Sequence, residues 1–153
     1  MTFIDSTTEQ VASGSRSRPA SPVVAVVATT PETAVADMGQ AMDLAGVARF
    51  LAPDIKTHLK VNISWQHWYP GCSTTPWQIE GVAKALRDRG HKDLIAAHNG
   101  TVVVNSYEGE AKNKHKAAQE KAGLPDIHLD SPPNGWIDYK PKAEMLVLSL
   151  IHI

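Results

Sequence analysis

Polar side chains that could bind a ligand gather in two stretches of the 153-residue chain. In the first stretch, Lys60 and Asn62 belong to an alternating apolar and polar segment, and Ser73, Thr74 and Thr75 precede a helical pattern. Free backbone N–H groups at the start of a helix favour an anion, and the helix dipole adds to this preference. We therefore expect a small anionic ligand, such as a phosphate or carboxylate group, to bind these five residues. The alternative is that Thr75 only caps the helix and its neighbours face water.

The second stretch follows a short apolar run and contains His98, Asn99 and Thr101. We expect Asn99 and Thr101 to contact the same ligand, and His98 to act as a general acid or base, with a role as a metal ligand as the alternative. A metal site of His98 with His67 and Cys72 is conceivable, but no recognised ligand spacing is present. We therefore assign no metal ligand.

Aromatic side chains are concentrated between the two stretches, in the loop Trp65–Tyr69 and at Trp77. They suit a docking surface for a protein partner, or else they pack the loop onto the sheet.

Cys72 is the single cysteine of the chain, and it suits a buried inert role better than that of a nucleophile. One cysteine cannot hold an iron–sulfur cluster, so we assign no cofactor. The net charge of −1 favours neither nucleic acid nor an anionic membrane.

Short apolar runs alternate with helical patterns along the chain. The strand-like runs are Val23–Ala28, Ile55–Ser64, Leu94–Ala97, Val102–Val104 and Ile127–Leu129, with two further short runs at 136–139 and 145–147. The helical patterns are 29–45, opened by a capping box at Thr29–Glu32, a short turn at 47–51, 75–90, opened by a second capping box, and 105–122. This alternation predicts an α/β fold, three-layer-like, with a mostly parallel sheet built from βα units.

The chain divides by composition into a polar leader and a folded domain. Residues 1–22 are rich in Ser, Thr, Gly and Arg, which predicts a disordered leader, and residues 23–147 carry the α/β pattern. Asp5 and Glu9 stand where an export signal would be basic, and the run at 23–28 is too short to span a bilayer. We therefore expect a cytoplasmic protein that does not enter a membrane.

The end of the chain, Leu148–Ile153, is apolar and has no cap or polar tail. One reading frame of the transposase mosaic end, which is used in sequencing adapters, encodes the same six residues. We interpret residues 148–153 as adapter read-through, so that 23–147 is the N-terminal part of a larger, truncated domain.

Three segments resemble the domain-of-unknown-function 362 family: Leu59–Trp65, Cys72–Val82 and Ala97–Val103. Val61 stands where that family usually has proline. Some members carry ferredoxin-type iron–sulfur modules, for which this chain has no cysteine cluster. Residues and resemblance together lead us to expect part of a redox or metabolic enzyme with an anionic-ligand or metal-assisted site at the carboxyl ends of the strands. The alternative is a non-catalytic binding or assembly module associated with an iron–sulfur protein.

Overall fold

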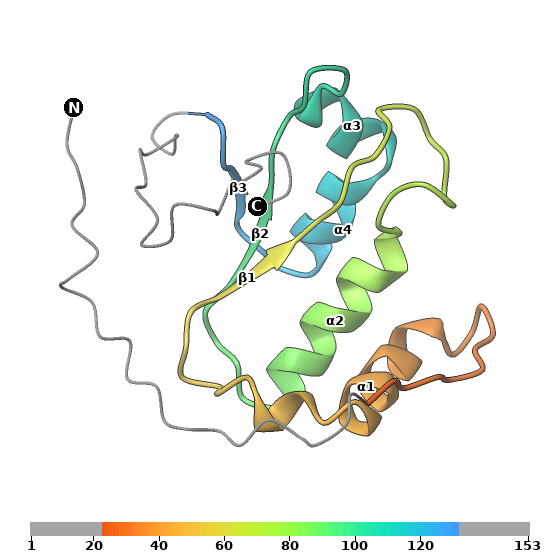
Figure 1. Cartoon of the computed structure of the whole chain (residues 1–153), viewed down its shortest axis with the longest axis vertical. Coiled ribbons are helices and arrows are strands. Elements are labelled where there is room, and N and C mark those ends of the chain that lie inside the picture. Colours follow the sequence, from red (N-terminus) through yellow and green to blue (C-terminus); the bar gives the residue numbers. More distant parts are fainter. Residues whose placement is uncertain (1–22, 132–153) are drawn as a thin grey trace, which may run out of the picture.

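The computed structural model describes residues 23–131, which form an α/β fold with a parallel sheet, as predicted (Figure 1). The elements in chain order are α1 (Ala34–Leu44), the short 3-10 helix η1 (Val47–Arg49), β1 (Thr57–Lys60), α2 (Pro76–Asp88), β2 (Leu94–His98), α3 (Ser106–Lys112), α4 (His115–Lys121) and β3 (Asp126–His128). The three strands pair in the order β1-β2-β3, and both pairings are parallel.

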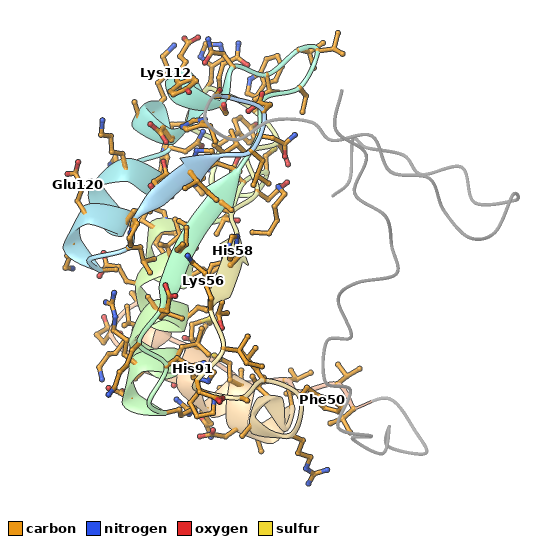
Figure 2. All side chains as sticks on the ribbon, turned by 90° about the vertical axis from the view of Figure 1, so that its left-hand side faces the viewer. Phe50, Lys56, His58, His91, Lys112 and Glu120 are labelled. Carbon is orange, nitrogen blue, oxygen red and sulfur yellow. The ribbon has the colours of Figure 1, made fainter. Side chains whose placement is uncertain are left out.

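The helices of the described part lie together in one layer. Because the strands follow one another across the sheet, right-handed crossovers place α2, α3 and α4 on the same face. Helix α2 packs against α4, and α1 packs against α2. Figure 2 shows α3 and α4 to one side of the strands. A helical layer on the opposite face, where His58 and Lys60 are exposed, is not seen within residues 23–131.

The apolar core fills the space between this helix layer and the sheet. It is formed by Val61, Ile79, Ala83, Leu86, Leu94, Ala96, Ala118 and Leu124. Leu94 and Ala96 point toward the helices because side chains alternate along a strand, and the next residue on that face is His98. The sheet therefore aims a histidine, at the end of a buried strand, into the space beneath α3 and α4.

Helix α2 begins and ends as its sequence predicts. The backbone N–H of Thr75 donates to Oε1 of Gln78 at 2.9 Å, which is the capping-box contact, and Pro76 occupies the first turn. Gly90 follows the helix with φ of +92°, a conformation that glycine adopts without strain. This helix positions the loop of residues 62–75 over the end of β1.

Helix α1 begins later than predicted, because Thr33 and not Thr29 precedes its first turn. The hydroxyl of Thr33 donates to the carboxylate of Asp37 at 2.6 Å, an interaction that fixes the start of the helix here. The predicted capping box at Thr29–Glu32 is therefore wrong. The predicted short turn at 47–51 is confirmed as η1.

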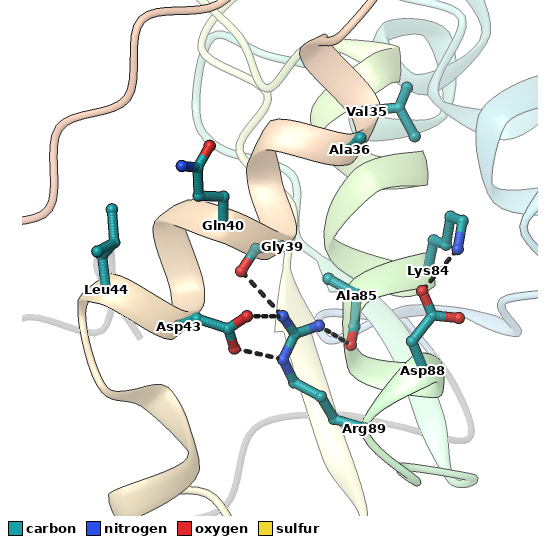
Figure 3. Close-up of a pocket in the computed structure, with 10 residues that line it drawn as sticks. All are labelled: Val35, Ala36, Gly39, Gln40, Asp43, Leu44, Lys84, Ala85, Asp88 and Arg89. Carbon is teal, nitrogen blue, oxygen red and sulfur yellow. Dashed lines mark hydrogen bonds and ion pairs between the residues drawn. The ribbon is translucent and has the colours of Figure 1, made fainter.

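A single arginine holds α1 on α2 (Figure 3). Arg89 donates to both carboxylate oxygens of Asp43, at 2.8 and 2.6 Å, and to the carbonyl oxygen of Gly39 at 2.9 Å. The hydrogen bond from Arg89 lowers the pKa of Asp43. These contacts line a surface depression of about 400 Å³ between the two helices. Arg89 lines this depression and already makes hydrogen bonds there to α1, so we assign the depression to helix packing.

Two runs of valine that predicted strands are not strands. Val24 and Val26 are 83% and 85% exposed, and residues 23–28 pair with no strand of the described part. In Val102–Val104, the N–H of Thr101 donates to the carbonyl of Val104 at 3.0 Å and closes a tight turn, with Val102 fully exposed. Strand propensity expresses packing on a paired, half-buried surface, which neither run has.

The predicted helix 105–122 is two helices, α3 and α4. Asn113 ends α3 and donates its side-chain amide to the carbonyl of Trp65 at 2.8 Å, and Lys114 has φ of +61°. The break bends the segment toward the loop of residues 62–75.

Several predictions fall outside the described residues: the leader 1–22, the strands at 136–139 and 145–147, and the tail 148–153. None of the helices between residues 23 and 131 has the length and apolar character needed to cross a membrane.

Candidate metal centre

Two strands and one helix bring four ionisable side chains to one point: His98, Glu110, Asp126 and His128. His98 ends β2 and pairs in register with His128 of β3. Asp126 lies two residues before His128, so both side chains point to the same face of the sheet. Glu110 is a buried residue of α3, and its carboxylate contacts the three strand residues from the helix side.

The facing atoms of the four residues have the spacing of ligands around one ion. From Nε2 of His98 the distances are 3.1 Å to Nε2 of His128, 3.1 Å to Oε2 of Glu110 and 3.5 Å to Oδ2 of Asp126. From Nε2 of His128 they are 3.3 Å to Oε2 of Glu110 and 3.7 Å to Oδ2 of Asp126. A tetrahedral ion with bonds of about 2.0–2.1 Å places its ligand atoms about 3.3–3.4 Å apart.

The cluster is withdrawn from solvent. The side chains of His98, Glu110 and His128 are 1%, 8% and 10% exposed, and that of Asp126 is 24% exposed. Among the described residues, Oε2 of Glu110 is buried without a hydrogen-bond partner, although Nε2 of His98 lies 3.1 Å away. Burying ionisable groups in this way costs free energy unless the charges are compensated. A cation at the shared point would compensate them.

The electrostatic environment keeps His98 neutral. Burial lowers its pKa to about 4, although the nearby Asp126 carboxylate partly opposes the shift. Burial and a hydrogen bond with Glu110 raise the pKa of Asp126 to about 6. A neutral imidazole is the form that binds metals, whereas a general base works best with a pKa near the operating pH. The acid–base role of His98 stays a prediction, and its surroundings suit a ligand better.

Outer contacts orient the ring of His128. Oγ of Ser106 lies 2.9 Å from its Nδ1, and the ring of Tyr107 stacks on it with centroids 3.7 Å apart. Both residues lie in the first turn of α3, where Asn105 caps the helix by accepting from the N–H of Glu108 at 3.1 Å. A hydroxyl bonded to Nδ1 leaves Nε2 directed at the ligand point, the usual outer support of a metal-binding histidine.

The residues predicted to bind an anion close their own loop. The N–H of Asn62 donates to Oγ1 of Thr74 at 2.9 Å, and the N–H of Thr74 donates to the carbonyl of Asn62 at 3.0 Å. The N–H of Ser64 donates to Oγ of Ser73 at 3.3 Å. Thr75 caps α2, as the alternative interpretation held. An anion at these residues stays a prediction.

Lys60 and Thr101 line two separate hollows, Asn99 lines neither of them, and neither hollow is lined by a residue of the cluster. Lys60 and Thr74 line a depression of about 360 Å³ between β1 and α2. Thr101 lines a different cavity, and the side-chain amide of Asn99 donates to the carbonyl of Gly100 at 2.9 Å. The buried His115 of α4 hydrogen-bonds the carbonyl of Thr74 and so ties the loop to the helix layer.

The partners of His98 in the structure are not those considered from the sequence. The cluster contains neither His67 nor Cys72, and Cys72 is exposed rather than buried. Two of the actual neighbours of His98 could have been noticed in the sequence. Asp126 and His128 stand two residues apart at a predicted strand, so their side chains should point to the same face. Glu110 carried no such signal, since its direction depends on how α3 packs over the sheet.

Fold and cluster together define the class of this protein as an α/β domain with a histidine–carboxylate centre beneath its third helix. No protein-family model, curated protein or solved structure matches the chain. The resemblance to the domain-of-unknown-function 362 family stays a prediction.

Proposed function

We propose that this domain binds one divalent transition-metal ion, Zn²⁺ in the first instance, through His98, Glu110, Asp126 and His128. The centre would be the metal-assisted site of a cytoplasmic metabolic enzyme. The single observation that carries the proposal is the set of four ligand atoms, mostly buried, that lie within 4.8 Å of one another. The cytoplasmic part rests on the acidic residues early in the chain, and the family resemblance adds the expectation of an enzyme.

The donor set favours zinc over the harder divalent ions. Two imidazole nitrogens and two carboxylate oxygens suit Zn²⁺, whereas Mg²⁺ and Ca²⁺ prefer oxygen alone and higher coordination numbers. Asp126 is the most exposed of the four ligands, so solvent and substrate approach the centre from its side. Because four protein ligands complete a tetrahedral shell, a substrate oxygen, such as that of a carboxylate or phosphate group, would reach an ion there only by displacing Asp126 or as a fifth ligand, and the ion would then act as a Lewis acid on that oxygen.

The test is a metal titration of the chelator-treated protein. We expect calorimetry to show one Zn²⁺ per chain, and cobalt substitution to give the intense visible absorption of a tetrahedral site. His128→Gln should abolish both signals. His58→Gln, at an exposed histidine on the other face of the sheet, should leave both unchanged. Absence of saturable binding would mean that the cluster is only a hydrogen-bonded network.

The aromatic loop supports a second candidate function, the docking of a protein partner. Trp65, Trp68 and Tyr69 are 43%, 41% and 63% exposed, so they do not pack the loop onto the sheet fully. The side-chain amine of Lys114 lies 4.9 Å from the ring centre of Trp68. We expect Trp68→Ala to abolish metal-independent association of the chain in sedimentation velocity. Association that persists in Trp68→Ala, or a wild-type chain that stays monomeric, argues against this function.

A further inference from the structure

The outer edge of β1 is an unpaired strand edge in the part of the chain that the structure describes. The strand order β1-β2-β3 leaves β1 at one border of the sheet, with α2 beside it (Figure 1). The N–H of Val61 donates to the carbonyl of Ala97 in β2 at 2.9 Å. Because the backbone groups of successive residues alternate in direction along a strand, those of His58 and Lys60 point away from β2. These two residues therefore offer two N–H and two C=O groups along the edge.

The chain itself pairs with the next position on this edge. Asn62 continues the outward series after His58 and Lys60. The N–H of Thr74 donates to the carbonyl of Asn62 at 3.0 Å, and the N–H of Asn62 donates to Oγ1 of Thr74 at 2.9 Å. The edge therefore accepts an extended segment where the loop of residues 62–75 reaches it, and Thr74 marks the point where any further partner must end.

A depression of about 360 Å³ lies beside the unpaired edge, between β1 and α2. Its walls include Leu59 of β1 and the residues Gln78 and Val82, which lie one turn apart on α2. Leu59 and Val82 are apolar and only half-buried, so each keeps surface that another apolar side chain can cover. An extended chain that pairs with the edge directs every second side chain to the face of the sheet on which this depression lies.

The other face of β1 carries two lysines. Lys56 and Lys60 are exposed on either side of the exposed His58, and neither lysine forms an ion pair within residues 23–131. Nζ of Lys60 donates to the carbonyl of Val61 at 3.4 Å, which leaves two of its three N–H groups for a partner. Lysines on an edge strand oppose unselective pairing with other strands. A strand with acidic side chains on this face replaces that repulsion by attraction.

We propose that the edge of β1 binds an extended peptide segment of another protein, with apolar side chains facing α2 and acidic side chains facing Lys56 and Lys60. The backbone of His58 and Lys60 supplies the hydrogen bonds, the depression selects the apolar residues and the lysines select the acidic ones. The chain's own β-prone run 23–28 has no acidic residue, so it lacks the second feature. The site shares no residue with the cluster on β2, β3 and α3, so peptide binding does not require the metal.

The experiment is a titration of the zinc-free full chain with acetyl-Glu-Val-Glu-Val-Glu-amide, followed by NMR and hydrogen exchange. We expect saturable binding that slows exchange at the amides of His58 and Lys60, because both amides become hydrogen-bonded. Acetyl-Lys-Val-Lys-Val-Lys-amide reverses the charge, and acetyl-Glu-Ser-Glu-Ser-Glu-amide removes the apolar side chains. Each should bind about tenfold more weakly or worse.

A charge reversal on the protein makes the same test from the other side. Lys60→Glu should weaken binding of the acidic peptide about fivefold or more and should strengthen binding of the lysine peptide. Lys116→Glu makes the same change of charge at an exposed lysine of α4 and should bind as the wild type does. Should Lys60→Glu not fold, the two peptides of opposite charge give the comparison on the wild-type chain.

Three results would overturn the proposal. Equal affinity for the acidic and the lysine peptide would remove the role of the lysines. Binding that leaves exchange at His58 and Lys60 unchanged would place the peptide elsewhere. A peptide of residues 23–30 that binds as tightly as the acidic peptide would show that the edge fits a second copy of this chain. Because every arm uses zinc-free protein, failure of the metal proposal leaves these results unaffected.

Discussion

Replacing Glu110 by glutamine is expected to lower the affinity for Zn²⁺ by at least about 100-fold, since loss of an outer-shell partner alone costs 10–100-fold. In the proposed centre Glu110 would contribute a direct ligand atom, Oε2, which lies 3.1 Å from Nε2 of His98 and 3.3 Å from Nε2 of His128. Glutamine keeps the shape of the side chain and removes the negative charge that the ion needs. The change therefore tests the charge and not the packing of α3.

The affinity is measured by competition with a chromogenic chelator. Glu108→Gln is the matched control, because Glu108 lies on the same helix but is exposed and pairs with Lys112. Zinc at 100 times its wild-type dissociation constant should stabilise the wild type by about 2.7 kcal/mol, and the same zinc concentration should stabilise Glu110→Gln by at most about 0.4 kcal/mol. Wild-type affinity in Glu110→Gln would show that the ion, if bound, lies elsewhere.

Replacing Gly81 by valine is expected to destabilise the fold by about 1–3 kcal/mol, the usual cost of overpacking. A Cβ at Gly81 would lie 2.6 Å from Cγ of Met38 and 2.8 Å from the backbone carbonyl oxygen of Val35. The backbone contact cannot relax by a rotamer change, so α1 must move off α2. Valine is a better helix former than glycine by only ~0.3 kcal/mol, which does not offset the clash.

Urea unfolding followed by circular dichroism measures the change. Gly71→Val is the control, because a Cβ at Gly71 meets nothing within 4 Å and the residue is exposed in a loop. A loss of stability as large in Gly71→Val would indicate a general effect of valine for glycine. An unchanged midpoint in Gly81→Val would show that α1 is not held closely against α2.

Local chemistry made several elements predictable. Thr75 with Gln78 defines the start of α2, Gly90 marks its end, and the short apolar run beginning at Leu94 is β2. In each case the information lies within a few residues, in caps, a glycine or side-chain periodicity. The same reasoning failed at Val23–Ala28, where apolar content does not show whether a neighbouring strand is present to pair with.

The candidate site was less predictable than the elements. His98 was recognised by its place after a strand, but the residues expected to join it came from the loop of residues 62–75. In the structure, residues of that loop hydrogen-bond one another.

The sequence by itself determined the α/β class, the parallel sheet and the presence of His98 at a strand end, because alternation of strands and helices leaves few topologies. Only the tertiary structure decided what His98 meets. Its contact with His128 depends on the register of β2 against β3, and its contact with Glu110 depends on how α3 packs over the sheet. Both are set by packing between segments that are distant in sequence, so the centre appears only when the chain is folded.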